Sequence, residues 1–107
     1  ILVDGEHKLS CLVIAAQLEG RDIVTIEGMA GKDGLHPIQE SFIRHGAVQC
    51  GFCTPGMVIA AEATLRRAPN ASREAIREGL AGNLCRCTGY QKIVDAVEHA
   101  ARTEEKP

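Results

Sequence analysis

The chain has 107 residues, of which 45% are hydrophobic and 3% aromatic, and its 12 basic and 14 acidic side chains leave a net charge of −2. A chain of this length can form one modest domain, or one small domain with part of another. The mixed charges exclude a basic DNA-binding stripe, and the few aromatic residues exclude a base-stacking platform. Membrane insertion is excluded because the chain has no apolar run of roughly 20 residues.

The first 27 residues carry a strand-like pattern. Ile1–Val3, Lys8–Ser10 and Ile23–Ile26 are predicted strands, separated by an Asp-Gly and a Glu-Gly turn. So few strands cannot form an independent core. Because the chain opens within a strand, we expect a truncated or processed N-terminus. The glycine-rich residues 28–36 are predicted to be a linker.

Helical periodicity begins after this linker. The first predicted helix starts at Pro37 and ends near Gly46, with an apolar side formed by Ile38, Phe42 and Ile43. The second is expected to be capped by Thr54, with Pro55 in its first position, and to stop before Pro69. Its apolar positions are Met57, Ala60, Ala61, Thr64 and Leu65.

Two further helices complete the pattern. Ser72 is the predicted cap of the third, which buries Ile76 and Leu80 and ends at Gly82-Asn83. A capping box of Thr88 and Gln91 is predicted to start the fourth, whose buried residues are Ile93, Val97 and Ala100. The sequence therefore predicts a mainly α protein, with a four-helix bundle over residues 37–102 and a polar tail over residues 103–107.

Four of the five cysteines form two close pairs, Cys50 with Cys53 and Cys85 with Cys87. Residues two apart on a helix point in nearly opposite directions, so the second pair requires an extended or looped backbone to face one metal centre. Each pair precedes a predicted helix, whose N-terminus favours negative thiolates. A helical hairpin over the intervening residues would return the chain to its starting end. Four soft ligands indicate an iron–sulfur cluster or a closed zinc site.

The spacing leaves several chemistries open. A zinc site with four cysteine ligands would make the chain a structural or interaction domain without redox activity, although zinc ribbons more often repeat C-x2-C than C-x-C. A Rieske cluster needs histidines, and none lies beside either pair. A dithiol oxidoreductase acting through Cys50 and Cys53 is a third interpretation, but no βαβ pattern follows them. The odd cysteine, Cys11, excludes a complete disulfide framework within the chain and favours a reducing context.

Two segments carry a family resemblance. Residues 49–56, Gln-Cys-Gly-Phe-Cys-Thr-Pro-Gly, and residues 82–90, Gly-Asn-Leu-Cys-Arg-Cys-Thr-Gly-Tyr, resemble the small iron–sulfur subunit of the molybdenum hydroxylases. This family includes xanthine dehydrogenase, aldehyde oxidoreductase, aerobic carbon monoxide dehydrogenase and 4-hydroxybenzoyl-CoA reductase. The similarity continues through residues 35–39, and back through 25–28 and 10–11 to 3–5.

The resemblance implies a set of ligands. Cys50, Cys53, Cys85 and Cys87 would bind one [2Fe–2S] cluster in the C-terminal bundle, and Gln49 and Cys87 would approach a molybdopterin held by a partner subunit. Family members also have an N-terminal β-grasp, ferredoxin-like domain with a second [2Fe–2S] cluster. Cys11 matches the fourth ligand of that cluster, but the C-x4-C-x2-C run that supplies the other three is absent. Residues 1–27 are accordingly expected to be a remnant of that domain.

The expected function is that of an electron-transfer iron–sulfur subunit. Single electrons would pass between a molybdenum centre on a large subunit and a further cluster, a flavin or an external acceptor, so the chain itself would hold no catalytic residue. The implied partners are a molybdopterin-binding large subunit and, as a further candidate, an FAD-binding medium subunit. The expected compartment is the cytoplasm, with the periplasm as the alternative if a missing segment or a partner carries an export signal.

Overall fold

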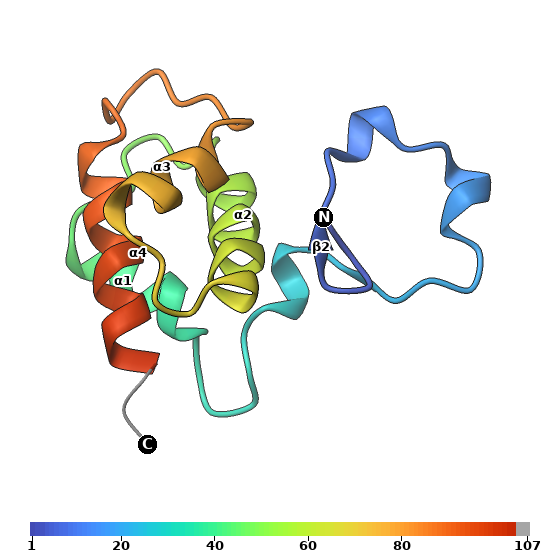
Figure 1. Cartoon of the computed structure of the whole chain (residues 1–107), viewed down its shortest axis with the longest axis horizontal. Coiled ribbons are helices and arrows are strands. Elements are labelled where there is room, and N and C mark those ends of the chain that lie inside the picture. Colours follow the sequence, from blue (N-terminus) through green and yellow to red (C-terminus); the bar gives the residue numbers. More distant parts are fainter. Residues whose placement is uncertain (105–107) are drawn as a thin grey trace.

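The computed structural model describes the backbone of residues 1–104 and the side chains of residues 1–102 (Figure 1). A small N-terminal unit stands beside a helical bundle. The N-terminal elements are the strands β1 (Leu2–Val3), β2 (Glu6–His7) and β3 (Ile23–Val24) and the 3-10 helices η1 (Ser10–Leu12), η2 (Ala15–Leu18) and η3 (Ile26–Gly28). The bundle consists of α1 (Pro37–Arg44), α2 (Thr54–Arg67), α3 (Arg73–Leu80) and α4 (Gln91–Glu104).

The N-terminal strands form an antiparallel sheet in the order β2-β1-β3, with Leu2 paired to both His7 and Val24. The expected Asp-Gly turn joins β1 and β2. The strand predicted over Lys8–Ser10 is wrong, because Ser10 already begins η1. The strand predicted over Ile23–Ile26 is shortened to two residues, since η3 begins at Ile26. The sheet is too small to enclose a core of its own, so its buried Leu2 joins the helical core.

Helix α1 packs mainly against α4. Its N-cap is His36, whose Nδ1 accepts a hydrogen bond from the backbone N–H of Ile38 at 3.1 Å. Ile38 and Phe42 are buried as predicted, but Ile43 is 64% exposed. The prediction for Ile43 is wrong because this residue lies about 100° around the helix from Phe42, which turns it away from α4.

Helix α2 is the centre of the bundle and contacts the other three helices as well as β2 and η3. Every residue from Met57 to Leu65 is buried, and small alanines on several sides of the helix permit this close packing. The predicted cap is wrong by one position. Cys53 is the N-cap and Thr54 is already helical, which puts Pro55 in the second position, where a missing N–H still costs no hydrogen bond.

The helix pair α3 and α4 closes the bundle. Ser72 caps α3 as predicted, since its Oγ accepts from the backbone N–H of Ala75 at 3.1 Å. The capping box predicted for α4 is wrong, because Thr88 lies outside the helix and its Oγ1 accepts from the backbone N–H of Tyr90. Helical backbone continues to Glu104, two residues into the predicted polar tail, and residues 105–107 of that tail lie outside the described part of the chain.

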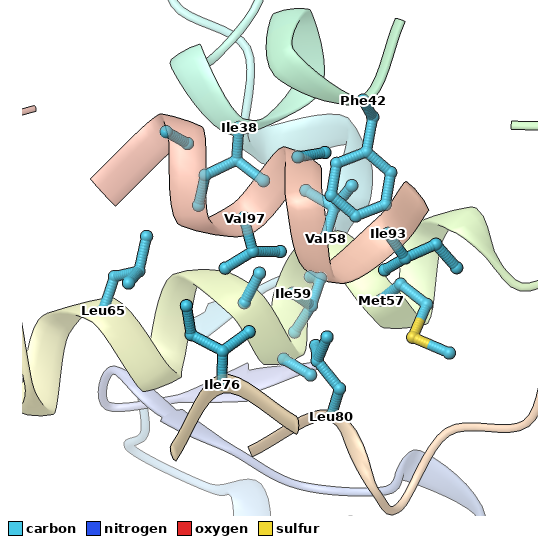
Figure 2. Close-up of a cluster of buried hydrophobic side chains, with 14 of the residues drawn as sticks. Ile38, Phe42, Met57, Val58, Ile59, Leu65, Ile76, Leu80, Ile93 and Val97 are labelled. Carbon is cyan, nitrogen blue, oxygen red and sulfur yellow. The ribbon is translucent and has the colours of Figure 1, made fainter. Parts of the chain in front are cut away.

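The core lies between the helices (Figure 2). Side chains from all four helices meet there, and the largest that are fully buried are Ile38, Phe42, Met57, Val58, Ile76, Ile93 and Val97. The mainly α architecture predicted from the sequence is confirmed. None of the helices described over residues 1–104 is long and apolar enough to cross a membrane.

Candidate metal centre

Two loops at one end of the bundle carry the paired cysteines (Figure 1). The first connects α1 to α2 and contains Cys50 and Cys53, and the second connects α3 to α4 and contains Cys85 and Cys87. Gly51 has φ +87°, a left-handed conformation that lets the first pair sit in a tight turn. Both Cys85 and Cys87 have non-helical backbone, as the two-residue spacing predicts.

The α2–α3 hairpin brings the second pair back to the first. Helix α2 runs away from Cys53 and α3 returns, which places the thiol of Cys85 beside that of Cys53. Burial raises the pKa of Cys53 to about 11, and the hydrogen bond that the Cys53 thiol donates to Cys85 and the nearby charges of Cys85 and Cys50 contribute to this increase. Cys87 is likewise hydrogen-bonded to Cys50, which raises the pKa of the Cys87 thiol.

The four thiols therefore form an inner and an outer pair. Cys53 and Cys85 are half-buried and pack against the edge of the hydrophobic core. Cys50 and Cys87 are exposed. Charge interactions cross between the pairs, from Cys50 to Cys53 and from Cys85 to Cys87. Each thiol of the first loop thus contacts one thiol of the second loop, and the two pairs lie near each other.

This donor set fits a two-iron cluster better than a single ion. In a [2Fe–2S] cluster each iron takes two protein thiolates, so the ligands separate into two pairs. A closed zinc site instead needs four ligands around one point. The two-by-two arrangement is the observation that matches the cluster.

Two hydroxyl residues that were not predicted to belong to the site contact Cys85. Its Sγ lies 3.1 Å from Thr88 Oγ1, and its backbone N–H donates to Tyr90 Oη at 2.9 Å. Hydrogen bonds from the hydroxyl and the N–H of Thr88 are the main causes that lower the pKa of Cys85 to about 7. Both residues lie in a loop, within five residues of a predicted ligand, and this closeness in sequence is the signal that could have identified them.

Two of the predicted site residues are not part of this thiol cluster. Cys11 is exposed in η1, within the N-terminal unit and away from the end of the bundle that carries the other cysteines (Figure 1). Gln49 is exposed directly before Cys50, in the first loop. Its location is compatible with contact to a group outside this chain.

The [2Fe-2S] binding domain family matches residues 25–98, which include all four clustered cysteines. The chain belongs to this family. The cofactor expected from the resemblance is therefore confirmed as a [2Fe–2S] cluster, and the choice between cluster and zinc that the spacing left open is decided for the cluster. The matched segment begins in the N-terminal unit and extends through most of the bundle.

Small iron–sulfur subunits of oxidoreductases are similar over nearly the whole chain. The nicotine 6-hydroxylase small subunit of Paenarthrobacter nicotinovorans is 53% identical over 91% of this chain and 58% of its own length. The xanthine dehydrogenase iron-sulfur-binding subunit of Escherichia coli O157:H7 is 50% identical over 97% of this chain and 67% of its own length. These shares confirm the predicted family, and they also show that the chain spans about three fifths to two thirds of these relatives.

A solved structure shows the same fold. A chain of quinoline 2-oxidoreductase from Pseudomonas putida 86 superposes with a TM-score of 0.87 at 49% identity, covering 98% of this chain and 68% of that one. The agreement covers both the N-terminal unit and the bundle. The [2Fe–2S] domain fold is thus shared along with the sequence.

Proposed function

We propose that this chain is the electron-transfer iron–sulfur subunit of a molybdopterin-dependent hydroxylase or dehydrogenase. The observation that carries the proposal is the gathering of four cysteines, as two pairs, at one end of the bundle. The similarity to small subunits of nicotine 6-hydroxylase and xanthine dehydrogenase supports it. A bound [2Fe–2S] cluster would supply one-electron transfer, and the protein would supply ligands, burial and hydrogen bonds.

The pairing suggests which ligands share an iron. Cys53 and Cys85, in contact and half-buried, would hold the inner iron, and Cys50 and Cys87, in contact and exposed, would hold the outer one. The outer pair would then face the partner. Gln49 and Cys87 would approach the molybdopterin of the large subunit, a role supported by their exposure beside the outer pair.

The same end of the molecule presents apolar side chains to solvent. Phe52, between the first two cysteines, is 92% exposed, and Leu84, directly before Cys85, is 83% exposed. A cavity of about 390 Å³ lies beside Leu84 and Tyr90. Large exposed apolar residues around a functional centre are typical of a protein–protein interface. We assign this surface to the molybdopterin-binding large subunit, with an FAD-binding medium subunit as a further candidate partner elsewhere on the chain.

The rest of the chain would support electron transfer and would not convert substrate. Residues 1–27 would be the remnant of a β-grasp domain, followed by a linker over 28–36 and the cluster domain over 37–102, and Cys11 would ligate the second cluster. No catalytic residue is assigned to the chain. The odd number of cysteines favours a reducing compartment, which supports the cytoplasm.

Metal analysis tests the proposal. Anaerobically purified protein should be reddish, should bleach with dithionite, and should contain about two irons and two sulfides per chain for the helical cluster alone, or about four of each if a second cluster is present. Cys85→Ser should remove the helical cluster, because the inner pair loses a ligand. The matched variant Cys11→Ser should leave that cluster in place. One zinc per chain without colour, or full iron content in Cys85→Ser, would contradict the proposal.

A further inference from the structure

Three hydrogen bonds close the loop between α3 and α4 around Cys85. The backbone N–H of Cys85 donates to Tyr90 Oη at 2.9 Å, and the backbone N–H of Tyr90 donates to Thr88 Oγ1 at 3.1 Å. The third contact joins Thr88 Oγ1 to Cys85 Sγ at 3.1 Å. The thiol, the hydroxyl of Thr88 and the ring of Tyr90 are therefore held as one unit.

The direction of the third bond follows from the second. The Thr88 oxygen already accepts from the Tyr90 N–H, and its own hydrogen is left to donate. A cysteine that ligates a metal is a thiolate and carries no hydrogen. In the loaded protein the Thr88 hydroxyl is thus the donor and Cys85 Sγ the acceptor.

The backbone of this loop is strained at Tyr90, the residue whose N–H and hydroxyl take part in two of these bonds. Tyr90 has φ +72°, a left-handed conformation that is uncommon for a residue with a side chain, and Gly89 before it has φ +69°. Such strain persists only where surrounding contacts hold it, and it is found at functional sites. Tyr90 is held at both ends, by its N–H and by its hydroxyl.

The hydroxyl of Thr88 does not serve as a cap of helix α4. Helix α4 begins at Gln91, and the Thr88 hydroxyl bonds to Tyr90 rather than to the first turn of the helix. Its remaining interaction is with the sulfur of Cys85. The side chain thus has the position of an outer-shell partner to a metal ligand, which orients the ligand and alters its electron density.

We propose that Thr88 is a positioning residue whose hydroxyl donates a hydrogen bond to the ligand sulfur of Cys85 and raises the reduction potential of the cluster. The inference rests on the proposed function, in which Cys85 is a ligand. The reduced cluster has one more negative charge, shared with its sulfur atoms, so a donor to sulfur stabilises the reduced form more than the oxidised form. One electron is gained in this step and no proton is transferred.

The test is a redox titration monitored by EPR on the full chain in the complex in which it is purified. We compare Thr88→Val, which keeps the shape and removes the hydroxyl, with Thr88→Ser, which keeps the hydroxyl. Thr88→Val should shift the potential of one cluster to more negative values, and Thr88→Ser should restore it. Thr54→Val is the matched control, because Thr54 directly follows Cys53 at the start of α2 and, among the described residues, its hydroxyl makes no hydrogen bond to a thiol. It should leave the potential unchanged.

The outcomes separate this inference from the proposed function. A wild-type protein without a [2Fe–2S] signal would refute the proposed function itself. A wild-type cluster whose potential is the same in Thr88→Val would overturn the role of Thr88 alone, as would an equal shift in Thr88→Ser or Thr54→Val. EPR detects loaded molecules only, so partial loss of cluster does not obscure the shift. If Thr88→Val retains no cluster, Thr88→Ala is titrated instead and the same shift is required.

Discussion

Helices α2 and α3 are in close contact at Gly79. A Cβ atom at this position would lie 2.1 Å from Thr64 Oγ1, 2.9 Å from Thr64 Cγ2 and 3.0 Å from Thr64 Cβ. Thr64 cannot easily move away, because it is buried and its hydroxyl donates to the carbonyl of Ala60 at 2.8 Å. Gly79→Ala therefore has to separate the two helices or break that hydrogen bond.

The expected cost follows from two opposing terms. Overpacking a close contact costs about 1–3 kcal/mol. Alanine is the better helix former and returns up to about 1 kcal/mol. Because the clash is with the buried Thr64, the cost should lie at the upper end of its range, so we expect Gly79→Ala to destabilise the protein by a net of about 2 kcal/mol. Each kcal/mol lowers the melting temperature of a domain of this size by about 4–8 °C. Because the α2–α3 hairpin returns the chain from Cys53 to Cys85, the variant should also bind less iron.

The assay is unfolding followed by circular dichroism at 222 nm, with samples compared at equal iron content because bound cluster adds stability. Gly82→Ala is the matched control, since a Cβ there meets nothing within 4 Å. Thr64→Ala should reduce the cost of Gly79→Ala, because it removes the two atoms other than Cβ that clash. Equal stability of Gly79→Ala and wild type, or an equal cost of Gly79→Ala with and without Thr64→Ala, would refute the close-approach argument.

Two further predictions concern charged side chains, one within the helical bundle and one within the N-terminal unit. The Glu62 carboxylate is nearly buried and contacts His36 Nε2 at 2.9 Å and Arg66 Nε at 2.7 Å. Glu62→Gln should lower the free energy of unfolding by about 1–2 kcal/mol, and no change in chemical denaturation would refute this. The backbone N–H of Asp22 and a nearby guanidinium hold the pKa of Asp4 below its usual value. The contribution of Asp4 to stability is therefore present above the unfolded-state pKa of this carboxyl, and it is lost as the pH falls through the folded-state pKa. An NMR titration of the Asp4 carboxyl should show the lowered pKa, and Asp4→Asn should flatten the acid side of the stability profile; an ordinary pKa would contradict the contact.

Much of the fold could be predicted from local sequence. Apolar spacing identified all four helices and their main buried residues, because a helical period of 3.6 selects the same face whatever packs against it. The cap at Ser72 was also predictable, since it depends on one hydroxyl and the following turn. The caps at Thr54 and Thr88 were not, because a cap is defined by where the backbone becomes helical, and packing decided that point differently in both loops.

For the candidate site, the sequence by itself determined the four thiols, their division into two loops and the non-helical backbone that Cys85 and Cys87 require. Tertiary structure decided which thiols contact each other and which are half-buried, because these depend on how the α2–α3 hairpin closes. It also decided the bond from Thr88 to Cys85, since that bond forms in a loop that Tyr90, in a left-handed backbone conformation, closes through its N–H and its hydroxyl. No local rule predicts this conformation for a tyrosine, because it is maintained only by contacts that the folded loop creates.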